Sequence, residues 1–158
     1  DRAGIVEGTN LIDRYCGTGS ISLLAARRGA RVFGLEWAES AVEDAERNAE
    51  LNEIEGCRFQ ALDLNKMHRS VDDLKAFGKP DVIITDPPRA GMHPKAVLAT
   101  KMLEPDRIVY VSCKPASLAR DAAMFCEDGS WTLKEVQPID LFPQTQHIEN
   151  VAVMERAD

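Results

Sequence analysis

A cysteine that can act as a nucleophile stands where a predicted strand becomes a predicted helix. Residues 108–111, Ile-Val-Tyr-Val, form an apolar run of strand length, and Pro115 suits the first position of a helix over residues 116–125. Cys113 therefore precedes the first helical turn, where free backbone N–H groups and the neighbouring Lys114 favour thiolate over thiol. A buried structural cysteine fits the same stretch, so the cysteine alone does not identify a function.

A glycine turn near the start of the chain is typical of a site that binds a nucleotide. The pattern Asp-x-Tyr-x-Gly-x-Gly over residues 13–19 joins a predicted strand at 10–15 to a predicted helix at 21–28. Its glycines let the backbone approach a ligand closely at a helix N-terminus. Such turns also occur as plain connections, so this interpretation depends on the next strand.

The next strand, residues 31–35, ends in the carboxylate Glu36. An acidic residue at this position of a doubly wound sheet is placed to accept hydrogen bonds from ribose hydroxyls. Nicotinamide dinucleotides and S-adenosylmethionine both present such hydroxyls. Glu36 therefore indicates a cofactor site without choosing between the two.

Two more carboxylates follow predicted strands. Asp63 follows residues 58–62, where it can meet the amino group of an adenine or simply cap a turn. Asp86 follows residues 81–85 and opens an Asp-Pro-Pro-Arg loop that its two prolines make rigid. Because open α/β sheets bind ligands at this edge, we expect Asp86 to face the reacting centre, where it would suit a sulfonium cation.

The remaining segments complete an alternating α/β pattern with strands near its end. We expect a helix with a solvated charged face at residues 39–51, a surface helix at 65–77, a strand at 131–141, a turn at 143–146 and a final strand at 148–154.

Four motifs together resemble the RNA (uracil-5-)-methyltransferase family, and they span nearly the whole chain. They are Tyr-Cys-Gly-Thr-Gly at residues 15–19, Asp-Pro-Pro-Arg-Ala-Gly at 86–91, Val-Ser-Cys-Lys-Pro at 111–115 and Gln-Thr-Gln-His-Ile-Glu at 144–149. The chain looks most similar to the branch that acts on 23S ribosomal RNA. Two positions depart from the family pattern: Lys114 replaces the usual asparagine, and Arg14 replaces a residue that is usually apolar.

The resemblance implies a Rossmann-like class I methyltransferase fold, with a mostly parallel seven-stranded sheet whose last strand is antiparallel. It implies S-adenosylmethionine as the cofactor, no metal, Cys113 as the nucleophile and Glu149 as the general base. The positions implied for the cofactor site are Tyr15, Ser20, Glu36, Asp63 and Asp86.

The implied reaction explains these residue types. Carbon 5 of uracil is a poor nucleophile, so the Cys113 thiolate would first add to carbon 6, and Glu149 would later remove the carbon-5 proton. Because a stacked base hides carbon 6, the uridine of the RNA partner would have to be unpaired or flipped out. His147, beside the base, is explained as well by a hydrogen bond within a turn.

Length, cysteine spacing and net charge limit the number of domains and the kinds of ligand that the chain can bind. The chain of 158 residues is the size of one domain, and its start suggests a part of a longer protein. The family resemblance implies that this is the C-terminal part and that upstream RNA-binding segments are missing, and free thiols favour a cytoplasmic location. Its four cysteines show no metal-binding spacing, and a net charge of −7 argues against polyanion binding by this surface alone.

Three hypotheses remain from the sequence. The first is the catalytic domain of a 5-methyluridine RNA methyltransferase. The second is a nicotinamide-dependent oxidoreductase, against which the Asp-Pro-Pro-Arg loop stands. The third is a fragment that binds cofactor and catalyses nothing alone.

Overall fold

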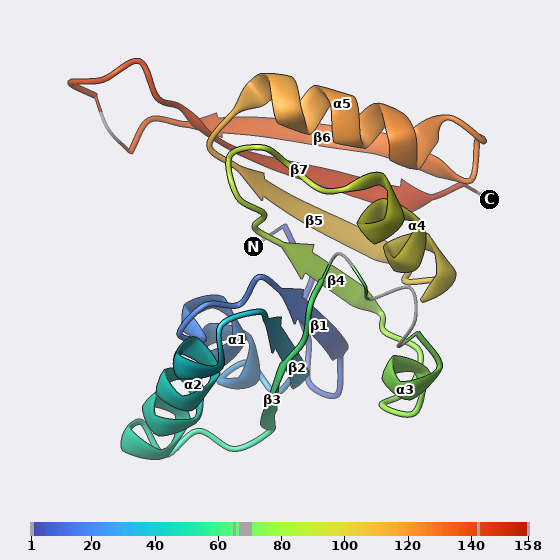
Figure 1. Ribbon diagram of the computed structural model, residues 1–158. Helices are drawn as coiled ribbons and strands as arrows, with labels where there is room; N and C mark the ends of the chain where they lie inside the picture. The colour runs from blue at the N-terminus through green and yellow to red at the C-terminus, as the bar shows by residue number, and fades with distance from the viewer. Residues whose placement is uncertain (1, 65, 67–70, 142, 158) are drawn as a thin grey trace.

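The computed structural model describes residues 2–64, 66, 71–141 and 143–157, and within them seven strands form one sheet in the order β3-β2-β1-β4-β5-β7-β6 (Figure 1). The strands are β1 (Asn10–Arg14), β2 (Arg31–Glu36), β3 (Cys57–Ala61), β4 (Val82–Thr85), β5 (Arg107–Ser112), β6 (Trp131–Ile139) and β7 (Glu149–Arg156). The helices are α1 (Ser20–Ala26), α2 (Glu39–Leu51), α3 (Val71–Lys75), α4 (Pro94–Met102) and α5 (Pro115–Cys126).

The pairing of the strands confirms the predicted sheet. Strands β1 to β5 pair in parallel, and β7 lies antiparallel between β5 and β6. Parallel pairing with covered faces explains why β4 is buried along its whole length and apolar at every position but its last, Thr85. The expected antiparallel last strand is therefore present.

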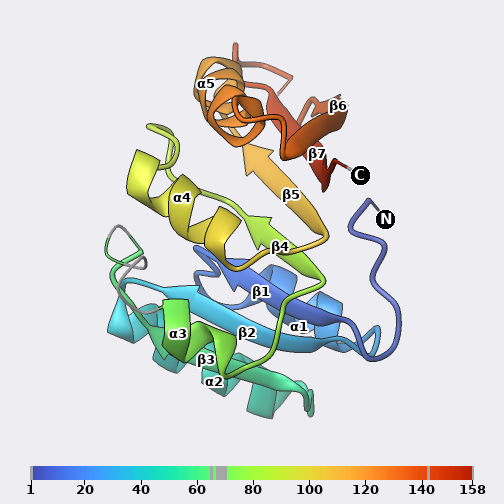
Figure 2. The same cartoon turned by 90° about the vertical axis from the view of Figure 1, so that its right-hand side faces the viewer.

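Helices cover both faces of the sheet, with α1 and α2 on one side and α3, α4 and α5 on the other (Figure 2). On the first side, Ala25 of α1 packs on Val32 and Val109. On the second side, α5 places Phe125 against Trp131, with ring centroids 6.4 Å apart. Among the described residues, every helix is too short or too polar to cross a membrane.

Three helices differ from the expectation. Helix α1, predicted over residues 21–28, begins at Ser20 and ends at Ala26. The helix predicted over residues 65–77 is present as α3 at Val71–Lys75, while residues 65 and 67–70 lie outside the described part of the chain. Helix α4 was not predicted, because the proline and glycine cluster before it reads as loop. Pro94 in fact begins this helix, and the His93 side chain caps it by accepting the Lys95 N–H at 3.2 Å.

Strand β6 ends two residues earlier than expected and is an edge strand. A bulge between Leu133 and Glu135 interrupts its pairing with β7, and Pro138 lies within it. Proline lacks an N–H donor, so an edge strand tolerates it where a central strand does not.

Arg14 is a fully buried cation that joins the sheet to α4. Its Nη1 donates to the Ala96 carbonyl at 3.1 Å and to the Thr100 hydroxyl, and its guanidinium lies over the Tyr15 ring, 5.6 Å from the centroid. Its Nε and Nη2 atoms have no hydrogen-bond partner within the described residues. Burial lowers the pKa of Arg14 to about 10, so the charged side chain lowers the stability of the folded state at neutral pH.

We expect Arg14→Met to raise the free energy of unfolding by about 1–4 kcal/mol, the range found when buried ionic groups are replaced by apolar side chains of similar volume. Thr100 keeps a partner in this variant, because its hydroxyl also donates to Ala96 O at 2.8 Å. Urea unfolding at pH 7 measures the change, with Arg2→Met, a change at an exposed ion pair, as the control. A loss of stability in Arg14→Met would show that the bonds to α4 outweigh the cost of burial.

Candidate active site

All but one of the residues predicted for the site lie at the sheet edge where the parallel strands end. Tyr15 follows β1, Glu36 ends β2, Asp63 follows β3 and Asp86 follows β4. Cys113 follows β5, and Glu149 begins the antiparallel β7 at the same edge. These residues lie together because neighbouring parallel strands end at the same edge.

The turn after β1 needs its unusual backbone. Tyr15 has a φ of 62°, and the N–H groups of Tyr15 and Cys16 both donate to Leu35 O, at 2.9 and 3.2 Å. Gly19, with a φ of 86°, begins α1, and a Cβ there would lie 3.2 Å from both Ala45 Cβ and Phe59 Cζ. Glycine therefore fits this position both for its backbone angle and for the space available.

Glu36 holds the tips of β1 and β2 together. Its Oε2 accepts the Gly17 N–H at 3.1 Å, while its Oε1 accepts the N–H groups of Trp37 at 2.7 Å and Ala38 at 3.2 Å. A carboxylate has about four acceptor positions, so these three bonds leave room for a ligand hydroxyl.

A pocket of about 520 Å³ opens at this edge. It is lined by Tyr15, Glu36, Trp37, Asp63, Leu64, Asp86 and Pro88. Four of the five residues predicted for the cofactor site are among them. Ser20 is the exception: it is exposed and lines a smaller hollow of about 170 Å³ with Leu23 and Arg27.

The lining of this pocket suits a cationic ligand better than an anionic one. Three of its residues, Glu36, Asp63 and Asp86, are carboxylates and none is basic; of the three, Asp63 is paired with Lys66 at 3.0 Å from outside the lining. The Gly17 N–H, which in a dinucleotide site would point at a phosphate, donates to Glu36 instead. Trp37, 74% exposed, and Leu64 add apolar surface for a planar base. Charge and shape thus fit a nucleoside that carries a positive group.

Cys113 and Glu149 are brought together by the pairing of β5 with β7. Ser112 lies opposite Asn150, so the residues one step further, Cys113 and Glu149, face each other across the strand ends. Asn150 Nδ2 reinforces this end of the ladder by donating to Ser112 O at 3.4 Å and to Ile148 O at 3.2 Å. Cys113 and Glu149 are both half-buried, so they are partly shielded and still accessible.

Asp86 lines the pocket and is influenced by the charge of Glu149. Although its side chain reaches solvent, desolvation raises the pKa of Asp86, and the negative charge of Glu149 raises it further. Asp86 follows β4 and Glu149 begins β7 at the same edge of the sheet. A positive group between them would relieve the repulsion.

Asp13 is a buried carboxyl beneath the site to which the sequence pattern assigned no role. Its Oδ2 accepts the Ser22 hydroxyl at 2.6 Å, and its Oδ1 has no partner within the described residues. Burial raises the pKa of Asp13 to about 7, and the charges of Asp86 and Glu36 contribute in the same direction. Burial and the charge of Asp13 also raise the pKa of Cys16 to about 12, so this thiol is not a nucleophile at neutral pH.

The side chain of His93 caps α4. In the β6–β7 connection, the backbone N–H of His147 donates to the Thr145 hydroxyl at 3.2 Å, and this bond does not involve the imidazole. His68 lies outside the described residues. In the part of the chain that the structure describes, no three His, Cys, Asp or Glu side chains are grouped to hold a metal ion.

We expect Asp13→Asn to gain stability over the wild type as the pH rises. The folded protein keeps the Asp13 proton up to a pKa of about 7, whereas the unfolded chain releases it near 3.8, so the contribution of Asp13 to stability is greatest below pH 3.8 and is lost as the pH rises through 7. Asparagine does not titrate, so the free energy of unfolding of the variant relative to wild type should be about 2–3 kcal/mol higher at pH 8 than at pH 5.

Urea unfolding at the two pH values measures this difference, with Asp140→Asn, an exposed aspartate, as the control. If the free energies of unfolding of Asp13→Asn and wild type differ by the same amount at pH 5 and at pH 8, the pKa of Asp13 is not raised by folding.

Comparison with known proteins places this geometry in a family. The model of the tRNA (uracil-5-)-methyltransferase family matches residues 5–157. An uncharacterised RNA methyltransferase of Chlorobaculum tepidum is 49% identical over 155 residues, which are 98% of this chain and 32% of that protein. One of Bacteroides thetaiotaomicron is 46% identical over 153 residues, 97% of this chain and 33% of that protein. The chain thus spans about a third of the length of these relatives.

Solved structures of methyltransferases have a similar fold. The Pyrococcus abyssi tRNA (uracil-54, C5)-methyltransferase in complex with S-adenosyl-L-homocysteine is 35% identical, with a TM-score of 0.81 over 96% of this chain and 36% of that chain. TrmN of Thermus thermophilus, 20% identical with a TM-score of 0.76 over 98% of this chain and 46% of that chain, supports the fold alone. The chain belongs to the tRNA (uracil-5-)-methyltransferase family.

Proposed function

We propose that the protein containing this chain methylates carbon 5 of a uridine in RNA through a covalent bond between Cys113 and the base. The observation that carries the proposal is the pairing of Ser112 with Asn150, which sets Cys113 beside Glu149 at the edge that also holds the acidic pocket. The family to which the chain belongs supports the same chemistry. The comparisons do not favour the nicotinamide-dependent alternative.

The cofactor proposed for the pocket is S-adenosylmethionine. Glu36 would accept the ribose hydroxyls, Trp37 and Leu64 would contact the adenine, and Asp63 would accept from its amino group. Asp86 and Tyr15 would lie nearest the positive sulfur. When bound, the cofactor supplies an electrophilic methyl group. A solved relative, from Pyrococcus abyssi, is described in complex with S-adenosyl-L-homocysteine, the product of such a transfer.

Cys113 would begin the reaction. Its thiolate forms a bond to carbon 6 of uracil, and the electron pair of the carbon 5–carbon 6 double bond moves toward the carbonyl oxygen at carbon 4. Carbon 5 becomes nucleophilic as a result. Cys113 lies two residues before the first residue of α5, at the positive end of that helix.

Glu149 would finish the reaction. Once carbon 5 carries the methyl group, it still holds its original hydrogen. The Glu149 carboxylate takes that proton, the double bond re-forms, and the bond from carbon 6 to Cys113 breaks to release 5-methyluridine and the thiolate. The half-buried position of Glu149 across from Cys113 suits this role, because both residues must reach adjacent carbons of one ring.

The target uridine must leave the base stack to reach Cys113. The motifs of the chain favour 23S ribosomal RNA in the cytoplasm, while the family and the Pyrococcus abyssi relative are named for tRNA. Full-length protein should therefore be assayed on both RNAs, with the modified position mapped by mass spectrometry. Transfer of methyl to neither RNA would overturn the proposal. Transfer by the full protein and none by residues 1–158 would support the inactive-fragment hypothesis.

We expect Glu36→Ala to weaken binding of S-adenosylhomocysteine by about 1.5–3 kcal/mol, the range for hydrogen bonds to a charged group. Calorimetry on the full-length protein measures the affinity, and NAD serves as the ligand that should not bind. Glu39→Ala is the matched control, because Glu39 is an exposed carboxylate at the start of α2 that does not line the pocket. Equal affinities in the two variants would count against Glu36 as a ligand.

The two proposed catalytic residues should give opposite results on a denaturing gel. Cys113→Ala should form no covalent RNA adduct. In Glu149→Gln the bound uracil should still receive its methyl group, but the covalent adduct should then accumulate, because removal of the carbon-5 proton must precede release of the cysteine. Cys126→Ala, at another half-buried cysteine, is the control and should behave as wild type. An adduct that persists in Cys113→Ala would exclude Cys113 as the nucleophile.

A further inference from the structure

Asp121 is a buried carboxylate that the proposed reaction does not use. Its side chain lies on α5 and is 0% exposed. Its Oδ2 accepts the Met92 N–H at 2.6 Å and the Tyr110 hydroxyl at 2.5 Å. Burial raises the pKa of Tyr110, and the bond to Asp121 raises it further, so the hydroxyl remains a donor. One oxygen thus joins α5, β5 and the loop between β4 and α4.

The second oxygen of Asp121 holds Arg120, which reaches the same loop. Oδ1 accepts from Arg120 Nε at 2.8 Å and Nη2 at 2.6 Å. The Nη2 atom also donates to the carbonyl of Ala90 at 2.9 Å and to that of Met92 at 3.2 Å. The carboxylate therefore orients a guanidinium whose other contacts are backbone oxygens of the loop.

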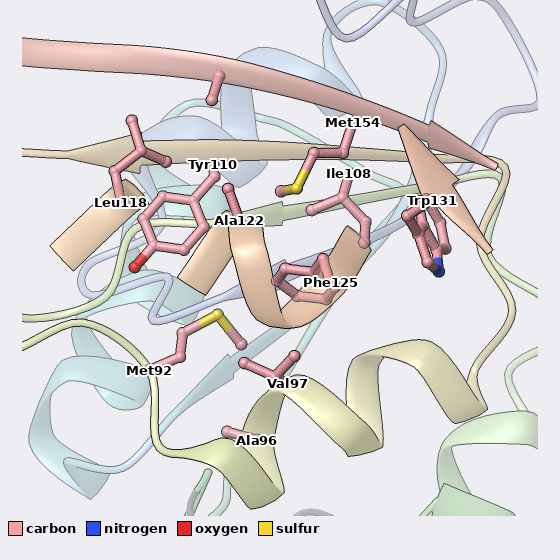
Figure 3. Close-up of a cluster of buried hydrophobic side chains, with 11 residues drawn as sticks. Met92, Ala96, Val97, Ile108, Tyr110, Leu118, Ala122, Phe125, Trp131 and Met154 are labelled. Carbon is pink, nitrogen blue, oxygen red and sulfur yellow. The ribbon is translucent and has the colours of Figure 1, made fainter. Parts of the chain in front are cut away.

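Further contacts of this loop show how closely it fits α5. The Ser117 hydroxyl donates to Arg89 O at 2.8 Å, and the Met92 side chain belongs to the buried cluster that includes Tyr110 and Val97 (Figure 3). Gly91 has a φ of 79°, and a Cβ there would lie 2.6 Å from both Arg120 Nη2 and Asp121 Oδ2. The loop lies directly against the charged pair, with no room for a side chain at Gly91.

This loop carries part of the site. It begins at Asp86, whose N–H donates to Arg14 O at 3.3 Å, and it includes Pro88, so two of its residues line the acidic pocket. Its far end at Met92 is bound to Asp121. Helix α5, which carries Asp121, begins two residues after Cys113. The same rigid element therefore adjoins the nucleophile and fixes the loop of Asp86.

We propose that Asp121 is a positioning residue: with Tyr110 and Arg120 it fixes the loop of residues 86–92 on α5 and so sets the place of Asp86 in the pocket relative to Cys113. Asp121 touches neither cofactor nor base and acts through the loop. The inference deepens the proposed function and rests on it for the role of Cys113. Its effect on the cofactor pocket requires only that the pocket binds S-adenosylhomocysteine.

The test compares Asp121→Ala and Asp121→Asn in the full-length protein, well below the unfolding temperature of each variant. We expect Asp121→Ala to weaken S-adenosylhomocysteine binding by about tenfold or more, because the Met92 N–H and the Tyr110 hydroxyl lose their acceptor and the loop relaxes. Asp121→Asn keeps one oxygen acceptor and should lose less. The rate of methyl transfer with both substrates saturating should fall in the same order, while RNA affinity stays unchanged.

Asp128→Asn is the matched control. Asp128 follows the far end of α5 and pairs with Lys101 at 2.5 Å, so this variant also removes an aspartate charge and an ion pair near that helix. It should bind S-adenosylhomocysteine and transfer methyl as the wild type does. A role of Asp121 in packing alone would lower the unfolding temperature of Asp121→Ala and leave its affinity and rate, once folded, at wild-type values; that result would overturn the proposal.

Failure of the proposed function and failure of the Asp121 proposal give different results. A wild-type protein that binds S-adenosylhomocysteine and methylates no RNA would refute the proposed function, while the comparison of affinities would still decide the role of Asp121. Where Asp121→Ala does not fold, Gly91→Ala carries the test, because it disturbs the same contact from the loop and leaves Asp121 in place. Unchanged affinity in folded Gly91→Ala would overturn the proposal.

Discussion

The antiparallel pairing of β5 with β7 is the interaction on which the site depends. In a purely parallel sheet, every strand would present its carboxyl end at the site edge. Here β7 runs the other way, so its first residue, Glu149, arrives beside the residue that follows β5. A shift of this pairing by one residue would turn every β7 side chain to the opposite face of the sheet. Ala152 and Met154, which pack under α5 at 0% exposure, oppose such a shift. The core beneath α5 therefore sets the position of Glu149 opposite Cys113.

Electrostatics at this edge favour a positive group. Glu36 and Asp86 line the pocket, Asp13 lies buried beneath it, and Glu149 stands close enough to Asp86 to raise its pKa. In the described residues, no basic side chain lines this pocket to offset those charges. Lys66 pairs with one lining carboxylate, Asp63, at 3.0 Å, but the other carboxylates repel one another and so lower the stability of the fold, an arrangement that is typical of functional sites. A sulfonium ligand would relieve the repulsion, whereas a pyrophosphate would increase it.

The sequence was informative wherever local pattern decides structure. Helix α2 begins and ends at the predicted residues, because the spacing of apolar residues along a long helix is a local property of the sequence. Helix α4 is not predicted from the sequence, because the two prolines and the glycine that precede it favour a loop. Pro94 nevertheless suits the first position of a helix, and His93 precedes it as the N-cap. Ser20 illustrates the limit for the site: it directly follows the glycine turn motif, but its exposed side chain lines a different hollow. The contacts of Asp121 join segments far apart in the sequence, so no local pattern could predict them.

The charge of the chain limits how the proposed RNA substrate can approach. With 19 basic and 26 acidic residues, the chain has no cationic excess to neutralise phosphates, and an acidic pocket repels a phosphate backbone. A flipped uridine can still enter, because the base is neutral and its phosphates stay at the rim. Arg89 is exposed on the loop after β4 and Lys114 is exposed beside Cys113, so both lie where rim phosphates would pass. Two cations support only weak contact. Under the proposed function, this surface alone would therefore bind RNA weakly and in a salt-dependent way.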